Sequence, residues 1–167
     1  SVIRLDRTDS IQHDMVRVGG GSLKADYPVL ASARPIPLGD FLMDRFEVTN
    51  REYKVFVDSG GYRRPEFWEP MQYAGKPISW NQGMTLLTDR TGRRGPASWE
   101  AGAPPTGTED DPVGGVSWYE AMAYARFAGK SLPTVIHWAR AASVMNSAWI
   151  VPPSNFAGQG PRPTGSS

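Results

Sequence analysis

Apolar and polar residues alternate in two runs near the start of the chain, and each run predicts a β-strand. Residues 15–18 ("MVRV") alternate and lead into three glycines, which free the backbone for a turn. Residues 38–48 ("LGDFLMDRFEV") repeat the alternation over a longer stretch. A third, shorter strand is expected over residues 97–100, inside a long segment rich in glycine and proline.

After residue 48 the pattern changes to that of short helices with marked starts. Three serine or threonine residues stand three positions before a glutamate or glutamine, which is the spacing of a capping box. In such a box the hydroxyl oxygen caps the helix, while the longer side chain accepts a hydrogen bond from the cap residue's own amide. The three pairs are Thr49 with Glu52, Ser79 with Gln82, and Ser117 with Glu120. We therefore predict helices that begin directly after Thr49, Ser79 and Ser117.

Residues 111–142 carry the strongest pattern in the chain. The helix after Ser117 is expected to run to about Ala128, and "SLPT" then turns the chain so that Thr134 caps a second helix. One face of the first helix is rich in alanine, which allows another backbone to approach closely; it comprises Ala121, Tyr124, Ala125 and Ala128. The segment is therefore interpreted as a helix–turn–helix packing unit, with no visible nucleophile or metal ligand.

Composition adds that the fold has many loops. The chain has 167 residues, of which 40% are hydrophobic, and contains 18 glycines and 15 prolines. This length suits one domain, and so many turn-forming residues favour short elements. Short strands together with short helices indicate an irregular, loop-rich α+β fold over residues 15–167, preceded by a linker or tail over residues 1–14.

Charge and hydropathy exclude two kinds of partner. The 18 basic and 17 acidic residues give a formal net charge of +1, without the basic stripe that binding to nucleic acid requires. No apolar run approaches the ~18 residues needed to cross a bilayer. We expect no nucleic-acid partner and no membrane segment in this chain, while its compartment stays open between cytoplasmic and extracytoplasmic.

The residue types that most often carry chemistry are scarce. The chain contains no cysteine, which excludes disulfides, thiolate metal sites and cysteine nucleophiles within it. His13 and His137 lack the spacing of a helical metal pair. The acidic run at residues 109–111 lacks alternating ligand spacing, so a solvated loop is favoured over a cation site. We therefore predict no catalytic residue.

Six tryptophans are many for a chain of this length. Large aromatic side chains pin loops to a small core, and most of the six are expected to do this. Trp99 lies in the long loop over residues 89–112, so we single it out as the candidate for an exposed ligand-binding residue.

Four stretches resemble the formylglycine-generating-enzyme (sulfatase-modifying factor) family. They are "FLMDRFEVTNREYKVFVDSGGY", "DPVGGVSWYEAMAYARFAGKSLPT", "HWARAA" and "SNFAGQGP", and the resemblance covers about residues 15–165. The resemblance is to a bacterial branch often attached to serine/threonine kinases. It implies a variant of the C-type-lectin-like fold, of which this chain matches the N-terminal half to two-thirds and lacks the C-terminal part.

The resemblance also implies metal sites. Family oxidases hold copper with a cysteine pair late in the domain, and this chain has no cysteine. The family's calcium site begins at positions that Asn155 and Phe156 occupy here, but no carboxylate follows them in "AGQGPRPTG". No cofactor is therefore assigned beyond a weak, incomplete calcium site at Asn155 and Phe156. His137 replaces the glutamate that usually completes the box after Thr134, a departure expected to affect capping.

Three functions remain open from sequence. The first is a catalytically inert binding or sensory module of a larger bacterial protein, whose loops over residues 62–112 present themselves to a peptide, glycan or protein. The second is part of an oxidase that converts a sulfatase cysteine to formylglycine, which the missing cysteines oppose. The third is an accessory domain of a non-haem iron sulfoxide synthase.

Overall fold

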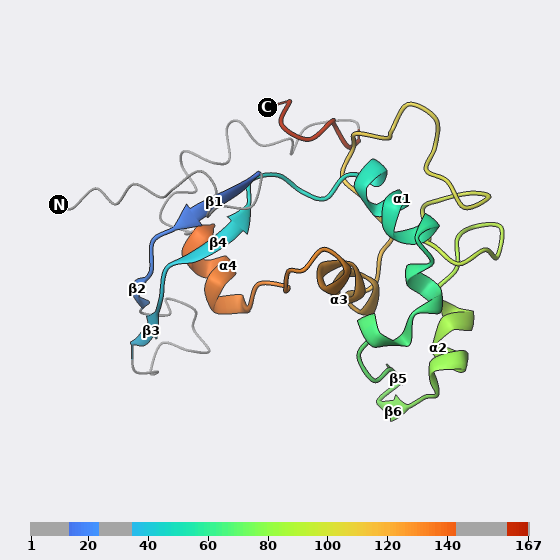
Figure 1. Cartoon of the computed structure of the whole chain (residues 1–167), viewed down its shortest axis with the longest axis horizontal. Helices are drawn as coiled ribbons and strands as arrows, with labels where there is room; N and C mark the ends of the chain where they lie inside the picture. Colours follow the sequence, from blue (N-terminus) through green and yellow to red (C-terminus); the bar gives the residue numbers. More distant parts are fainter. Residues whose placement is uncertain (1–13, 24–34, 143–159, 167) are drawn as a thin grey trace. The chain divides into compact units, whose positions relative to one another are not determined.

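The computed structural model describes residues 14–23, 35–142 and 160–166, and it is mixed α+β as predicted (Figure 1). These residues belong to two compact units. The first unit contains described residues 14–23, 35–46 and 133–142, and the second contains 47–132 and 160–166. The helices on either side of "SLPT" fall in different units, which differs from the single packing unit expected.

The first unit is built from two strand pairs and one helix. Strand β1 (Met15–Val18) pairs antiparallel with β4 (Phe41–Asp44), and β2 (Gly21–Leu23) pairs antiparallel with β3 (Ile36–Leu38) (Figure 1). Helix α4 spans Val135–Ala141.

Side chains of α4 contact strand β4 and the turn that connects β1 to β2. Arg140 donates to the carbonyl oxygens of Gly19 and Gly20, each at 2.9 Å. The ring of His137 lies edge-on to that of Phe41, with centroids 4.7 Å apart. His137 therefore has a packing role in this unit.

The single strand predicted over residues 38–48 is wrong. The run is broken after Leu38, where Asp40 turns outward and its carboxylate accepts the Gly20 backbone N–H at 3.0 Å. The second half then ends at Asp44, four residues earlier than expected. The break coincides with a change of phase, because Leu38 and Phe41 lie three positions apart and so cannot face the same side of one regular strand.

The second unit contains three α-helices and several shorter elements. The helices are α1 (Asn50–Asp58), α2 (Trp80–Leu86) and α3 (Trp118–Phe127). The short elements are the 3₁₀-helices η2 (Gly61–Arg63) and η3 (Pro65–Phe67) and the paired strands β5 (Gln72–Tyr73) and β6 (Lys76–Pro77). The strand expected over residues 97–100 is absent from the structure, which has only an isolated bridge between Glu100 and Ala103 there.

Each α-helix in the described residues begins at a capping box. The backbone N–H of the cap residue donates to the third residue's side chain at 2.8 Å for Thr49, 2.9 Å for Ser79 and 2.7 Å for Ser117. At Thr134 the acceptor is Nδ1 of His137, at 3.3 Å. The departure was expected to affect capping, and the structure shows that histidine preserves the box, because an imidazole nitrogen can accept the same hydrogen bond.

An aromatic core holds the second unit together. Its buried members are Tyr53, Phe56, Tyr62, Trp68, Met71, Met84, Trp99 and Ala123. Phe56 is fully buried and its ring lies within 6.4 Å of six other aromatic rings, so edge and tilted contacts dominate. The same ring fills the space that a Cβ on Gly61 would need, which explains the second glycine after α1.

The residues that helix α3 buries overlap the predicted face only at Ala125. Glu120, Ala123 and Ala125 are buried, whereas Ala121 and Tyr124 are half-buried. The helix nevertheless ends as expected, because Gly129 takes a left-handed conformation at φ 69°.

Candidate functional site

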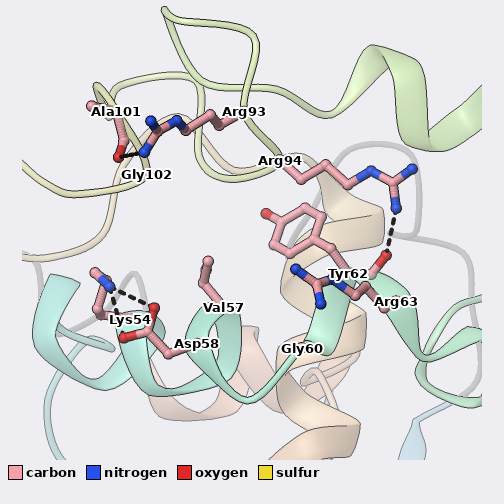
Figure 2. Close-up of a pocket in the computed structure, with 10 residues that line it drawn as sticks. All are labelled: Lys54, Val57, Asp58, Gly60, Tyr62, Arg63, Arg93, Arg94, Ala101 and Gly102. Atoms are coloured by element: carbon pink, nitrogen blue, oxygen red, sulfur yellow. Dashed lines mark hydrogen bonds and ion pairs between the residues drawn. The ribbon is translucent and has the colours of Figure 1, made fainter.

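A hollow of about 590 Å³ lies in the second unit, where the end of α1 and η2 face the loop over residues 93–102 (Figure 2). Helix α1 and the turn after it supply one wall, and the irregular loop supplies the other. The lining residues are Lys54, Val57, Asp58, Gly60, Tyr62, Arg63, Arg93, Arg94, Ala101 and Gly102. A volume of this size is in the range of small-molecule and peptide sites.

The hollow carries an excess of positive charge. It has four cationic side chains and one carboxylate, that of Asp58. Asp58 accepts from Nζ of Lys54 at 2.5 and 2.7 Å, one helical turn apart on α1. The ion pair leaves three arginine side chains whose charge no carboxylate in the lining neutralises.

Two of the three arginines are held by backbone carbonyl groups. Arg93 donates through Nη1 to the Ala101 oxygen at 2.7 Å, and Arg94 donates to the Tyr62 oxygen at 3.2 Å (Figure 2). These bonds fix where the guanidinium groups lie but use few of the five N–H donors that each one has. Within the described part of the chain, the Arg63 guanidinium has no hydrogen-bond or ion-pair partner.

The buried carboxylate of Asp89 holds the loop wall in shape. Its Oδ1 accepts from the backbone and hydroxyl of Thr91, both at 2.8 Å, and from the Arg93 N–H at 3.0 Å. Its Oδ2 accepts the Gly102 N–H at 2.7 Å. Desolvation opposes ionisation of this carboxyl, but the N–H of Gly102 and the donors of Thr91 and Arg93 outweigh it and lower its pKa. The ionised carboxylate therefore fixes both ends of the segment that carries Arg93 and Arg94.

A buried hydrogen-bond network lies behind Tyr62, on the core side of the hollow. The Tyr62 hydroxyl donates to Oε1 of Glu120 at 2.5 Å and lies 3.2 Å from the Tyr53 hydroxyl. Burial, with the adjacent Tyr53 and Glu120, raises the pKa of Tyr62, and burial also raises that of Tyr53. Both phenols therefore stay protonated across the physiological range and act as donors in a fixed network.

Trp99 does not have the exposed position that sequence suggested. Its side chain is fully buried, and its Nε1 donates to Oδ1 of Asn50 at 2.8 Å. Asn50 in turn donates to the Thr108 carbonyl at 2.9 Å. Trp99 thus anchors the long loop to the start of α1, and a ring with no exposed surface offers no face to a ligand.

The other predicted positions do not form a reaction site. Thr49, Ser79, Ser117 and Thr134 all occupy N-cap positions at separate helix starts. Asn155 and Phe156 lie outside the described residues, so the calcium site stays a prediction. Over residues 14–23, 35–142 and 160–166, no group of three or more acidic or histidine side chains is arranged to hold a metal. None of the helices described has the length and apolar character that crossing a bilayer needs.

Sequence reasoning missed the arginines of the hollow. A usable signal was present in two Arg-Arg pairs, at residues 63–64 and 93–94, each shortly after a glycine. Such pairs in turns place charge at the surface, but their 30-residue separation gave no reason to expect that they would meet. The contact depends on the loop returning over α1, which only the tertiary structure shows.

Comparison with known proteins gives a consistent result. A family model described as "Sulfatase-modifying factor enzyme 1-like domain" matches residues 5–151. Hercynine oxygenase of Mycolicibacterium smegmatis is 32% identical over 120 residues, covering 65% of this chain and 24% of that protein. Hercynine oxygenase of Mycolicibacterium thermoresistibile is 37% identical over 123 residues, covering 70% and 26%. Formylglycine-generating enzyme of Bos taurus is 33% identical over 119 residues, covering 65% and 32%. The chain therefore spans about a quarter to a third of the length of these curated relatives.

Proposed function

Because the chain belongs to the sulfatase-modifying factor family, we propose that it is a binding module of a larger bacterial protein and supplies no redox centre itself. The observation that carries this proposal is the cationic hollow beside α1, whose Arg63 has no ion-pair partner among the described residues. A preformed hollow with convergent polar groups is the usual form of a binding site.

The structural roles of the sequence motifs support the same proposal. The strongest motifs in the sequence supply helix caps and core contacts, and the one that reaches the hollow contributes Lys54 and Asp58, which are bound to each other. The absence of cysteine means that this chain provides no thiolate pair for copper.

A C-type-lectin-like scaffold is part of the proposal. Its support is the irregular architecture of two-stranded sheets, short helices and a long loop fixed by side chains such as Asp89. A scaffold of this kind presents loops on a rigid base, which suits recognition of a ligand. Attachment to a serine/threonine kinase, suggested by the resemblance, belongs to the same proposal.

An unbiased binding screen tests the module. The purified chain is applied to peptide and glycan arrays, and each hit is titrated by isothermal calorimetry. We expect saturable binding of one class of ligand with a stoichiometry near one. Failure of every peptide and glycan to bind in solution would remove the proposal.

A second candidate function is that the chain forms part of a larger oxygenase or oxidase. It is favoured by the names of the relatives of 32–37% identity. Two assays separate it from the binding module. Incubation with copper(I) and a Cys-x-Pro-x-Arg peptide is expected to give no aldehyde by mass spectrometry. Titration with iron(II) is expected to show no stoichiometric binding, and a one-to-one iron complex would favour this second candidate.

A further inference from the structure

We propose that the hollow beside α1 binds an acidic segment of a peptide chain, whose carboxylate or phosphate groups pair with Arg63, Arg93 and Arg94. This inference rests on the proposed binding function and names its ligand class. Arg63 comes from η2, whereas the other two come from the facing loop, so both walls carry positive charge; the Arg93 and Arg94 side chains extend in opposite directions along the loop wall (Figure 2).

The first step is the charge of the hollow. Four cations and one carboxylate line it, while the whole chain has a net charge of only +1. Positive charge is thus concentrated in this hollow relative to the rest of the surface. An opening lined by one sign of charge attracts the opposite sign and orients it on approach.

The second step is the supply of free donors. Guanidinium groups form paired, charge-assisted hydrogen bonds with carboxylate and phosphate oxygens. Arg93 and Arg94 have their positions fixed by bonds to the Ala101 and Tyr62 carbonyls, which reduces the ordering needed on binding. Arg63 keeps all its N–H donors available among the described residues. It is therefore the side chain that can donate the most hydrogen bonds to an incoming anion.

The third step concerns the size and kind of ligand. About 590 Å³ exceeds what a single inorganic anion fills, so the charged group belongs to a longer molecule. A nucleic-acid ligand is disfavoured, because a protein binds it through a stripe of basic side chains that follows the phosphate backbone, and this chain lacks such a stripe. A peptide with an acidic side chain satisfies both the charge and the volume, and Arg clusters recognise such motifs in other domains.

Asp58 acts as an internal competitor in this arrangement. Its carboxylate already neutralises Lys54, and its side chain is more than half exposed. Removing this carboxylate would free Lys54 for the ligand and raise the positive charge of the hollow. The structure thus provides one substitution that should weaken binding and another that should strengthen it.

The test measures binding of three fluorescent peptides of one length, with a glutamate cluster, a phosphoserine or a neutral sequence, by fluorescence anisotropy. Inorganic phosphate and free glutamate serve as competitors that separate a peptide site from a small-anion site. We expect the acidic peptides to bind and the neutral one not to, with affinity falling as salt rises. Arg63→Ala should weaken binding on the order of ten-fold, and Asp58→Asn should tighten it several-fold.

The matched control is Arg90→Ala, which removes an exposed arginine of the same unit that does not line the hollow. It changes net charge as Arg63→Ala does and should leave affinity within two-fold. Circular dichroism confirms that each variant is folded. Equal binding of neutral and acidic peptides, or equal loss in both arginine variants, overturns the acidic-peptide assignment while leaving a binding module in place. Absence of binding by all three peptides overturns the assignment, and the array screen then decides the broader proposal separately.

Discussion

Glu120 connects the start of α3 to the aromatic core through its two carboxylate oxygens. Oε2 accepts the Ser117 backbone N–H at 2.7 Å, and Oε1 accepts the Tyr62 hydroxyl at 2.5 Å. The side chain is only 3% exposed, so both oxygens depend on these protein donors. One residue thus completes a helix cap and satisfies a buried phenol that lines the hollow.

At the residue scale, the raised pKa of Tyr62 predicts a loss of stability in alkaline solution. Below the ordinary tyrosine pKa of about 10, both folded and unfolded states keep the proton and stability is unaffected. Above it the unfolded state loses the proton while the folded state retains it, so the unfolding free energy falls as pH rises. Each such tyrosine lowers it by about 1.4 kcal/mol per pH unit. Urea denaturation from pH 8 to 11 measures the slope.

Two variants separate this effect from general alkaline damage. Tyr62→Phe removes one titrating group and should make the fall above pH 10 shallower. Tyr73→Phe, at a tyrosine that is 64% exposed, should leave the slope as it is in the wild type. An unchanged slope in Tyr62→Phe would contradict the assigned role of this phenol.

The Trp99 indole gives a second prediction at the same scale. Trp99→Phe keeps a ring in the core but removes the N–H that Asn50 accepts, which should cost about 1–3 kcal/mol. Trp99→Ala also leaves a cavity and should cost about 3–5 kcal/mol. Chemical denaturation measures both. Trp118→Ala is the control, since this side chain is 57% exposed and its loss should cost less than about 1 kcal/mol.

At the scale of elements, capping boxes of the same kind begin both α1 and α3 but differ in burial. The boxes of α1 and α3 share their spacing and their glutamate, yet the α1 box is exposed whereas Glu120 is buried. Helices this short depend on caps and packing, because propensity alone does not sustain them. The contribution of each glutamate is therefore set by what else its carboxylate contacts.

This difference predicts unequal effects of equivalent substitutions. Glu52→Ala removes one exposed cap bond and should lower the unfolding free energy by about 1 kcal/mol. Glu120→Ala removes a cap bond and also leaves the buried Tyr62 hydroxyl without its acceptor, so we expect about 3 kcal/mol. Urea unfolding of the two variants compares them directly. Equal costs would show that the bond to Tyr62 adds nothing.

At the scale of the whole chain, sequence predicted what local chemistry determines. The helix starts at Thr49, Ser79, Ser117 and Thr134 follow from hydrogen bonds within four residues, and each occurs in the structure. The resemblance to the sulfatase-modifying factor family is confirmed by the family model over residues 5–151, within which three of the four stretches lie.

Contacts between distant residues could not be predicted in the same way. Trp99 was expected to be exposed because it lies in a loop, but its burial depends on Asn50, which is 49 positions away. The hollow likewise depends on the bond from Arg94 to the Tyr62 carbonyl, which is 32 positions away. The strand predicted over residues 38–48 was wrong for a local reason, since the odd spacing between Leu38 and Phe41 marks the turn that separates β3 from β4.

Asp89 gives the prediction that belongs to this larger scale, because its carboxylate shapes a loop and through it one wall of the hollow. Asp89→Ala leaves the N–H groups of Thr91, Arg93 and Gly102 without their acceptor, so the loop should open more often. Opening exposes arginines of this loop to trypsin, and mass spectrometry should find faster cleavage there. Asp110→Asn is the control, since it removes only an ion pair with Arg51 that is exposed to solvent and should therefore contribute little to stability. Cleavage of the Asp89→Ala loop at the wild-type rate would mean that the aromatic anchor at Trp99 holds the loop without the carboxylate.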